Sequence, residues 1–254
     1  MGATASTTVQ TQDLTKEPLL PSQVCAPGVL QTGDIVLFNG SGWRSALIRW
    51  FTWSNYTHVG MVHWRRIPGH GDAPVLCLWE STGHADKLPC LLHQRHKSGV
   101  RLVPLEHKLL EYVKADPWGD TRISVVPLQF RSDADRQTFE RLLIEFEDRV
   151  ADTPYAGSAS RLLAAGYPME LGTQHLAADI DSYTCNQLVA VTLIRARAFT
   201  SSLPDGQITV SGFAEGALDA RWSDLATTQG KNFVFRIVDP QQQQSTTTAP
   251  VMEL

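Results

Sequence analysis

Two short apolar runs on either side of a loop rich in proline and glycine restrict the fold more than any other feature of the sequence. The runs cover residues 57–64 and 75–80. The loop between them contains Pro68, Gly69, Gly71 and Pro74. This pattern is typical of two antiparallel strands joined as a hairpin. We therefore expect a sheet in which the first strand begins close to the point where the second strand ends.

Further strands and helices follow from the spacing of apolar residues along the rest of the chain. Short apolar runs predict strands at 34–38, 100–105, 122–128 and 233–238. Helical spacing predicts helices at 43–53, 105–113, 132–150 and 182–198. Either Ser132 or Asp133 can cap the third of these helices. Several short strands with helices grouped beside them indicate an α+β fold.

The two ends of the chain are polar and lack an apolar pattern. Residues 1–28 are rich in Thr, Ser, Gln and Pro and are expected to form a disordered leader. Residues 240–254 begin with a run of glutamines and are expected to form a disordered tail. We therefore predict one domain over residues 29–239. Within it, the segments 153–181 and 200–230 carry the weakest pattern, and either is a candidate lid or substrate loop.

Charge and cysteine content exclude several classes of function. The net charge of -4 gives no electrostatic basis for binding nucleic acid. Four cysteines in 254 residues are too few for a disulfide scaffold and favour a reducing, cytoplasmic compartment. The longest apolar stretch, residues 188–194, is far shorter than the about 20 residues of a membrane span. The sequence does not start with a charged segment followed by an apolar run, so we do not expect a secretory signal peptide.

The first six residues match the pattern for N-myristoylation, in which Gly2 becomes the acylated amine and Ser6 is the favoured hydroxyl residue. The pattern is short, and an unmodified polar leader is the simpler alternative. One acyl chain alone would give weak, reversible membrane attachment, because no cluster of basic residues follows to supply a second anchor. Weak membrane association of a cytoplasmic protein therefore stays open.

Cys185 is the first candidate catalytic residue. It lies at the start of the predicted helix 182–198, on the same inward stripe as Leu188 and Val189. With Ser182 as the N-cap, the thiol lies in the first turn. There the helix dipole and the unpaired backbone N–H groups favour a thiolate and can hold an oxyanion. The alternative is that Cys185 is only a small buried hydrophobic residue.

His58 and Glu80 are placed by the predicted hairpin. Each lies at the open end of its strand and shares a face with the other, so we expect a cross-strand pair. A carboxylate beside an imidazole fixes the tautomer and stabilises the imidazolium, as the base of a thiol nucleophile requires. Taken singly, each residue is more simply read as a surface residue. Together with Cys185, they predict a Cys–His–Glu triad.

Short blocks of the sequence also resemble a known family. These blocks are Gly33–Phe38, Leu47–Thr52, Tyr56–Gly60 and Tyr183–Cys185. In them, the chain resembles the circularly permuted papain-like (NlpC-type) cysteine hydrolases. The YiiX-like group is the most similar, and its wider relatives include the lecithin:retinol acyltransferase-like enzymes. In that family a histidine comes first, a polar residue follows on the next strand, and a cysteine comes last on a helix. The resemblance spans roughly residues 30–200.

The resemblance implies a permuted papain-like fold, in which a small antiparallel barrel or sheet packs against the helix that carries the nucleophile. It also implies hydrolysis or acyl transfer at an amide, ester or thioester carbonyl. In this scheme, His58 removes the proton of Cys185 and later protonates the leaving group, while Glu80 orients His58. The backbone N–H of Cys185 stabilises the oxyanion, with help from Tyr183. One departure is Gln187, where the group usually has glutamate.

Two competing interpretations concern metal and function class. A cluster within twenty residues suggests zinc: Cys77, His84, Cys90, His93 and His96. Its spacing does not match common zinc sites, so we expect neither a metal nor another cofactor.

A non-catalytic module that binds a lipid or a peptide in the same groove remains an alternative. The aromatic stretch 43–53 and the candidate acylation of Gly2 slightly favour lipid or acyl substrates over peptides.

Overall fold

The structure is a computed structural model and describes residues 17–39, 56–83, 88–116, 121–156, 182–199, 213, 223, 225–228 and 233–241. These segments form an α+β fold with an antiparallel sheet, which confirms the predicted fold class. The helices are α1 (Pro21–Val24), α3 (Leu105–Ala115), α4 (Asp133–Val150) and α6 (Cys185–Arg195). The strands are β1 (Ile35–Asn39), β2 (His58–Arg65), β3 (Val75–Thr82), β4 (Gly99–Pro104), β5 (Arg122–Val126), β6 (Leu128–Phe130), β7 (Ala226–Thr228) and β8 (Phe233–Arg236).

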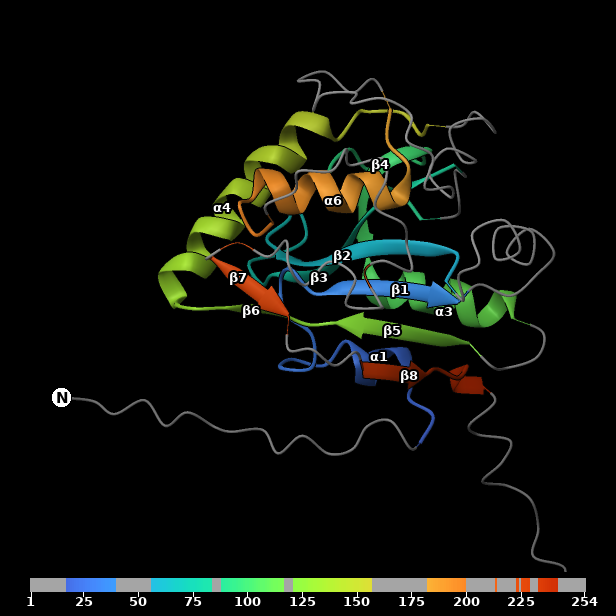
Figure 1. Cartoon of the computed structure of the whole chain (residues 1–254). Coiled ribbons are helices and arrows are strands. Elements are labelled where there is room, and N and C mark those ends of the chain that lie inside the picture. Colours follow the sequence, from blue (N-terminus) through green and yellow to red (C-terminus); the bar gives the residue numbers. More distant parts are fainter. Residues whose placement is uncertain are drawn as a thin grey trace, which may run out of the picture.

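The main sheet has six strands in the order β4-β3-β2-β1-β5-β8, and all of its pairs are antiparallel. β2 and β3 are the predicted hairpin, with Met61 opposite Trp79. On its other side, β2 pairs with β1, and His58 lies opposite Phe38. Figure 1 shows β2, β1, β5 and β8 side by side, with α6 lying along β2. His58 therefore begins its strand at the end of the sheet where β1 and β3 finish.

The sheet is buried on both faces, because consecutive residues of its central strands point to opposite sides. In β1, Ile35 and Leu37 belong to the core formed with α6 and α4. Val36 and Phe38 belong to a second core formed with α3 and α1. This arrangement explains why the segment is apolar throughout instead of alternating with polar residues.

The predicted strand 122–128 is two strands in the structure. β5 ends at Val126, and after Pro127 the chain continues as β6, which pairs with β7 in a two-stranded sheet. Proline has no backbone N–H to donate, so it ends the pairing with β1. The N–H of Leu128 instead donates to Oδ1 of Asp34 at 3.0 Å, which fixes the change of direction.

Part of the segment expected to be a disordered leader packs on the domain. Leu19 forms a parallel bridge with Ile237, and α1 buries Val24 completely. Both join the core beside α3, because the segment 19–30 supplies apolar side chains that cover this face of the sheet. The structured part therefore begins before residue 29. Residues 1–16, the tail beyond 241 and the predicted helix 43–53 lie outside the described residues.

The described helices are short or amphipathic. α4 buries Phe139 and Leu143, as its spacing predicts, and Oγ of Ser132 caps it by accepting from the N–H of Asp135 at 3.1 Å. α6 is more apolar and is tied to the sheet by a buried hydrogen bond, in which Nε1 of Trp79 donates to Oγ1 of Thr192 at 3.1 Å. In the part of the chain that the structure describes, no helix is both long and apolar enough to cross a membrane.

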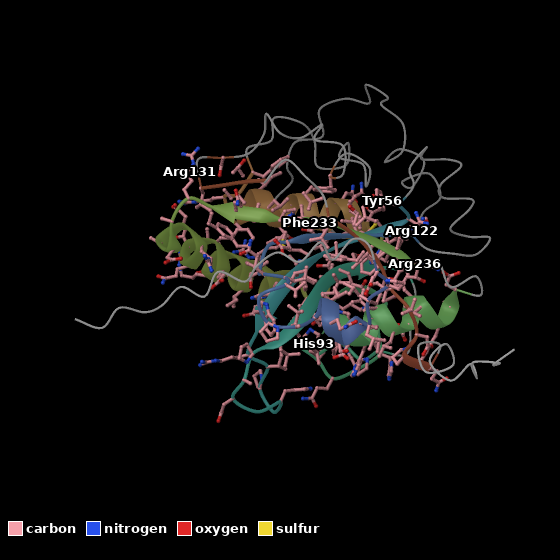
Figure 2. The ribbon with its side chains drawn as sticks, turned by 90° about the horizontal axis from the view of Figure 1, so that it is seen from below. Tyr56, His93, Arg122, Arg131, Phe233 and Arg236 are labelled. Atoms are coloured by element: carbon pink, nitrogen blue, oxygen red, sulfur yellow. The ribbon has the colours of Figure 1, made fainter. Side chains whose placement is uncertain are left out.

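The outer edge of the main sheet is charged. β8 is an edge strand, and its Arg236 lies directly opposite Arg122 of β5. Both side chains are exposed, and Figure 2 shows them on the same side of the molecule as Tyr56, which precedes β2. Charged side chains on an edge strand disfavour pairing with the strand of another chain.

Candidate active site

His58 and Glu80 form a part-buried ion pair at the end of the sheet. Nε2 of His58 lies 2.6 Å from Oε2 of Glu80. The register that pairs Met61 with Trp79 continues to Gly60 opposite Glu80, so His58 is the diagonal neighbour of the carboxylate. The two residues are therefore in contact. The hairpin pattern predicts that they lie directly opposite each other, and the observed register differs from that prediction by two residues.

Gly60 allows this diagonal contact. Because the position opposite Glu80 has no side chain, the imidazole of His58 can lean along the sheet toward the carboxylate. A Cβ atom at Gly60 would lie 2.7 Å from Cδ1 of Leu78 and 3.0 Å from the carbonyl oxygen of Trp79. Glycine is thus required by the close packing of the two strands.

Glu80 is fully buried and is surrounded by cations. Its Oε1 accepts from Nε of Arg101 at 2.9 Å, from Nη2 of Arg101 at 2.5 Å and from Nζ of Lys108 at 2.9 Å. Arg101 is the direct cross-strand partner of Glu80 on β4, and Lys108 comes from α3. Burial raises the pKa of the Glu80 carboxyl, but Lys108, His58 and Arg101 together hold this pKa well below its ordinary value. The carboxylate is therefore charged.

Cys185 is the first residue of α6. The N-cap is Thr184, not Ser182 as expected, and its backbone N–H donates to Oε1 of Gln187 at 3.1 Å. A neutral amide fills this capping role as well as a carboxylate would, which accounts for Gln187 in physical terms. Cys185 lies on the buried side of the helix, as its stripe predicts, and has 8% of its surface exposed.

The thiol of Cys185 and the ring of His58 interact closely enough to shift the pKa of each other. Since Nε2 of His58 is engaged with Glu80, Nδ1 is the nitrogen left for the sulfur. Burial raises the pKa of Cys185, but His58 and the backbone N–H groups of Val59 and Asn186 bring it below its ordinary value. Burial lowers the pKa of His58, but Cys185 and Glu80 raise it to about 9. This arrangement can hold a thiolate beside an imidazolium.

Two tyrosines lie near the start of α6. Tyr183 is buried in the core, and its carbonyl accepts from Oγ of Ser81 at 2.8 Å and from the N–H of Ala156 at 3.1 Å. These bonds fix the segment just before Cys185. Tyr155 forms a bridge with Tyr183, and burial and the charge of Cys185 raise its pKa above the ordinary value. The phenol of Tyr155 therefore lies within electrostatic reach of the sulfur.

Cys25 and Cys77 lack the features of a reactive thiol. Burial, as the largest cause, raises the pKa of Cys25 and of Cys77 to about 12. Among the described residues, no group of three or more His, Cys, Asp or Glu side chains is arranged to hold a metal ion. His84 of the cluster considered for zinc lies outside the described residues, as does the candidate acylation site Gly2.

Sequence reasoning did not identify Arg101, Lys108 or Tyr155. A signal for Arg101 was present, because a single arginine interrupts the apolar run 100–105 much as Glu80 ends the apolar run before it. Two opposite charges on neighbouring buried strands indicate a pair. Lys108 and Tyr155 have no comparable signal, because their contacts depend on how α3 and the segment after α4 pack on the sheet.

Comparison with known proteins gives distant similarity to solved structures. No family model and no curated protein matches this chain. Among solved structures, the crystal structure of the metalloprotein yiiX from Escherichia coli O157:H7 is similar, with 18% sequence identity and a TM-score of 0.39. The alignment covers 87% of this chain and 93% of that chain. At this level of similarity nothing about activity carries over, and the relation to permuted papain-like enzymes stays a prediction.

Proposed function

We propose that this protein is a cysteine-dependent hydrolase or acyltransferase that acts on an amide, ester or thioester carbonyl. The proposal rests on one observation, the chain of contacts that links the sulfur of Cys185 to His58 and His58 to Glu80. A merely structural cysteine at a helix start needs no imidazole partner. A merely structural histidine needs no buried carboxylate held in place by two further cations.

In the proposed reaction, the thiolate of Cys185 attacks the carbonyl carbon of the substrate, and the π electrons of the C=O bond move to its oxygen. The backbone N–H of Cys185, at the N-terminus of α6, donates to this oxyanion, with Tyr183 as the expected second contributor. The C–X bond then breaks, and the imidazolium of His58 gives its proton to the leaving group. Water or an acceptor alcohol or amine, deprotonated by His58, resolves the thioester of Cys185.

The decisive experiment is covalent labelling of the thiol. We expect an electrophilic acyl-type probe to modify the wild-type protein at Cys185 and to leave Cys185→Ala unlabelled. Cys25→Ala is the matched control and should label like the wild type, because burial raises the pKa of that thiol to about 12 and keeps it neutral. Undiminished labelling of a folded Cys185→Ala variant would refute the assignment of the nucleophile.

For the substrate class, we propose lipid or acyl groups ahead of peptides, on the basis of the aromatic stretch 43–53 and the myristoylation pattern at Gly2. A panel of fluorogenic thioester, lipid-ester and peptide-amide substrates tests this order of preference. Intact mass of protein made in a eukaryotic host tests the acylation and, with it, the proposed weak association of a cytoplasmic protein with membranes. Absence of Cys185-dependent turnover on every member of the panel would favour the non-catalytic binding module instead.

A further inference from the structure

The two oxygens of the Glu80 carboxylate have different partners. Oε1 receives the three hydrogen bonds from Arg101 and Lys108, whereas Oε2 receives the bond from Nε2 of His58. A carboxylate oxygen offers about two lone-pair directions, so Oε1 is saturated by the cations. Rotation of the carboxylate would break three charge-assisted bonds, and these bonds are among the strongest in proteins. The cations therefore aim Oε2 at the ring.

We propose that Arg101 and Lys108 are positioning residues of the catalytic site, which keep Glu80 ionised and thereby keep His58 in the protonation state that supports a thiolate. This inference rests on the proposed function. Arg101 and Lys108 contact the carboxylate of Glu80. Both act through Glu80, from a strand and a helix that do not carry the triad.

The physical reason lies in what a protonated Glu80 would do to the imidazole. A fully buried carboxyl without cations takes up a proton, because burial disfavours its charged form. It would then donate to Nε2 of His58 instead of accepting from it. The ring hydrogen would move to Nδ1, the nitrogen that faces Cys185. An imidazole with its hydrogen on Nδ1 cannot accept the thiol proton there, so the nucleophile would stay neutral.

Aromatic contacts through Phe38 also connect α3 to His58. Phe38 stacks on Tyr112 of α3 with ring centroids 4.5 Å apart. The centroid of the Phe38 ring also lies 5.7 Å from that of His58. Nζ of Lys108 lies 5.8 Å from the centroid of the Tyr112 ring. Among the described residues, the groups that shift the pKa of His58 are Cys185 from α6 and Glu80 from β3, and Arg101 from β4 and Lys108 from α3 bind Glu80 in turn.

The first test is the pH dependence of Cys185 alkylation by iodoacetamide in Lys108→Met, which keeps the length of the side chain and removes its charge. We expect the rate near pH 6 to fall about tenfold, with the acid limb of the profile moved up by about one pH unit. Lys108→Arg should restore most of the rate. Lys114→Met, which removes an exposed lysine from the same helix, should match the wild type.

An unchanged acid limb in a folded Lys108→Met protein would overturn the proposal. A purely structural role would lower the unfolding midpoint and leave the pH profile of the folded protein where it was. If Cys185 of the wild type still labels and Cys185→Ala does not, such a result removes only the role of Lys108 and leaves the proposed function standing.

A second measurement needs no variant at position 108. Long-range ¹H–¹⁵N spectra of the wild-type protein report which nitrogen of His58 carries hydrogen, with His58→Gln used to assign the signal. We expect the doubly protonated ring, or the form with hydrogen on Nε2, at every pH from about 5 to 8. Hydrogen on Nδ1 alone at neutral pH would contradict the proposal, whatever the folding behaviour of Lys108→Met.

Discussion

Cys185 is buried and only 12% of the His58 side chain is exposed, so burial alone would favour the neutral thiol and the neutral imidazole. The charged form of each is stabilised by the other and by further groups. The pKa of the thiol falls on account of His58 and two backbone N–H groups, and that of the ring rises on account of the sulfur and Glu80. Between the lowered pKa of the thiol and the raised pKa of the ring, we expect the pair to hold one proton, on the ring. Alkylation of Cys185 is therefore expected to be fast well below pH 9.

Gly60 gives a prediction about how tightly the site is built. In Gly60→Ala, the new Cβ would lie 2.7 Å from the side chain of Leu78, which is fully buried and cannot move away without displacing its neighbours. We expect the free energy of unfolding to fall by about 1–3 kcal/mol, as overpacking of a core does. Urea denaturation measures this change.

The control is the double variant Gly60→Ala, Leu78→Ala. Removing both Cγ and Cδ1 at position 78 takes away the two side-chain atoms closest to the new methyl group, so the double variant should lose less stability than the sum of the two single variants. Strictly additive losses would mean that the strands separate locally and that the close contact at Gly60 does not govern the packing.

At the scale of whole elements, α4 is fastened to β2 by a buried charge cluster away from the triad. Oε1 of Glu147 lies 2.8 Å from Nδ1 of His63, and Arg65 binds both Glu147 and Asp148, the latter at 2.5 Å. Glu147 is fully buried. The cluster joins a helix to the strand that begins with His58, so it contributes to the stability of the fold and not to the chemistry of the sulfur.

Glu147→Ala is therefore expected to destabilise the protein by about 1–3 kcal/mol, because it leaves the buried ring of His63 without its carboxylate and takes from Arg65 one of its two carboxylates. Thermal unfolding measures the loss, and the alkylation rate of Cys185 in the folded fraction should remain that of the wild type. The matched control is Glu145→Ala on the same helix, whose ion pair with Arg141 is exposed and is worth a few tenths of a kcal/mol. Equal effects of the two variants would show that the buried cluster adds nothing.

Periodicity in the sequence predicts these elements well and their pairing less well. The apolar spacing of α4 and the inward stripe of α6 place Phe139 and Cys185 correctly, because burial of one face is a local property of the chain. The register of β2 against β3 depends on the close approach at Gly60, and the division of the strand at Pro127 depends on a bond to Asp34 far away in the sequence. Such contacts leave no periodic signal.

For the molecule as a whole, the candidate site is a product of long-range packing. Two local rules, strand alternation and the position of a residue at a helix start, predict from the sequence that Cys185, His58 and Glu80 form one site. It could not reveal that Arg101 and Lys108 complete the network, because these residues meet Glu80 only once β4 and α3 have taken their places. A site assembled in this way links the ionisation of the triad to the global free energy of unfolding.

The sign of that linkage follows from counting protons. His58 binds its proton more tightly in the folded state, so its contribution to stability is complete below its ordinary pKa of 6.5 and is lost as the pH rises through about 9. Cys185 releases its proton more readily in the folded state. Its contribution is therefore complete above the ordinary thiol value of 9.0 and is lost as the pH falls through the lowered pKa. Between pH 6.5 and 9 the two changes oppose each other.

In this window the folded pair holds one proton on His58, and the unfolded chain holds one proton on the Cys185 thiol, so the free energy of unfolding should be nearly independent of pH between about 7 and 8.5. In Cys185→Ala, the thiol is gone while Glu80 still holds a proton on His58. Its stability should therefore fall as the pH rises, by at most about 1.4 kcal/mol per pH unit. Urea unfolding at several pH values gives both slopes.

Cys25→Ala should follow the wild type, because that thiol is neutral in both states over this range. Parallel curves for the wild type and Cys185→Ala would mean that the sulfur and the ring do not share a proton.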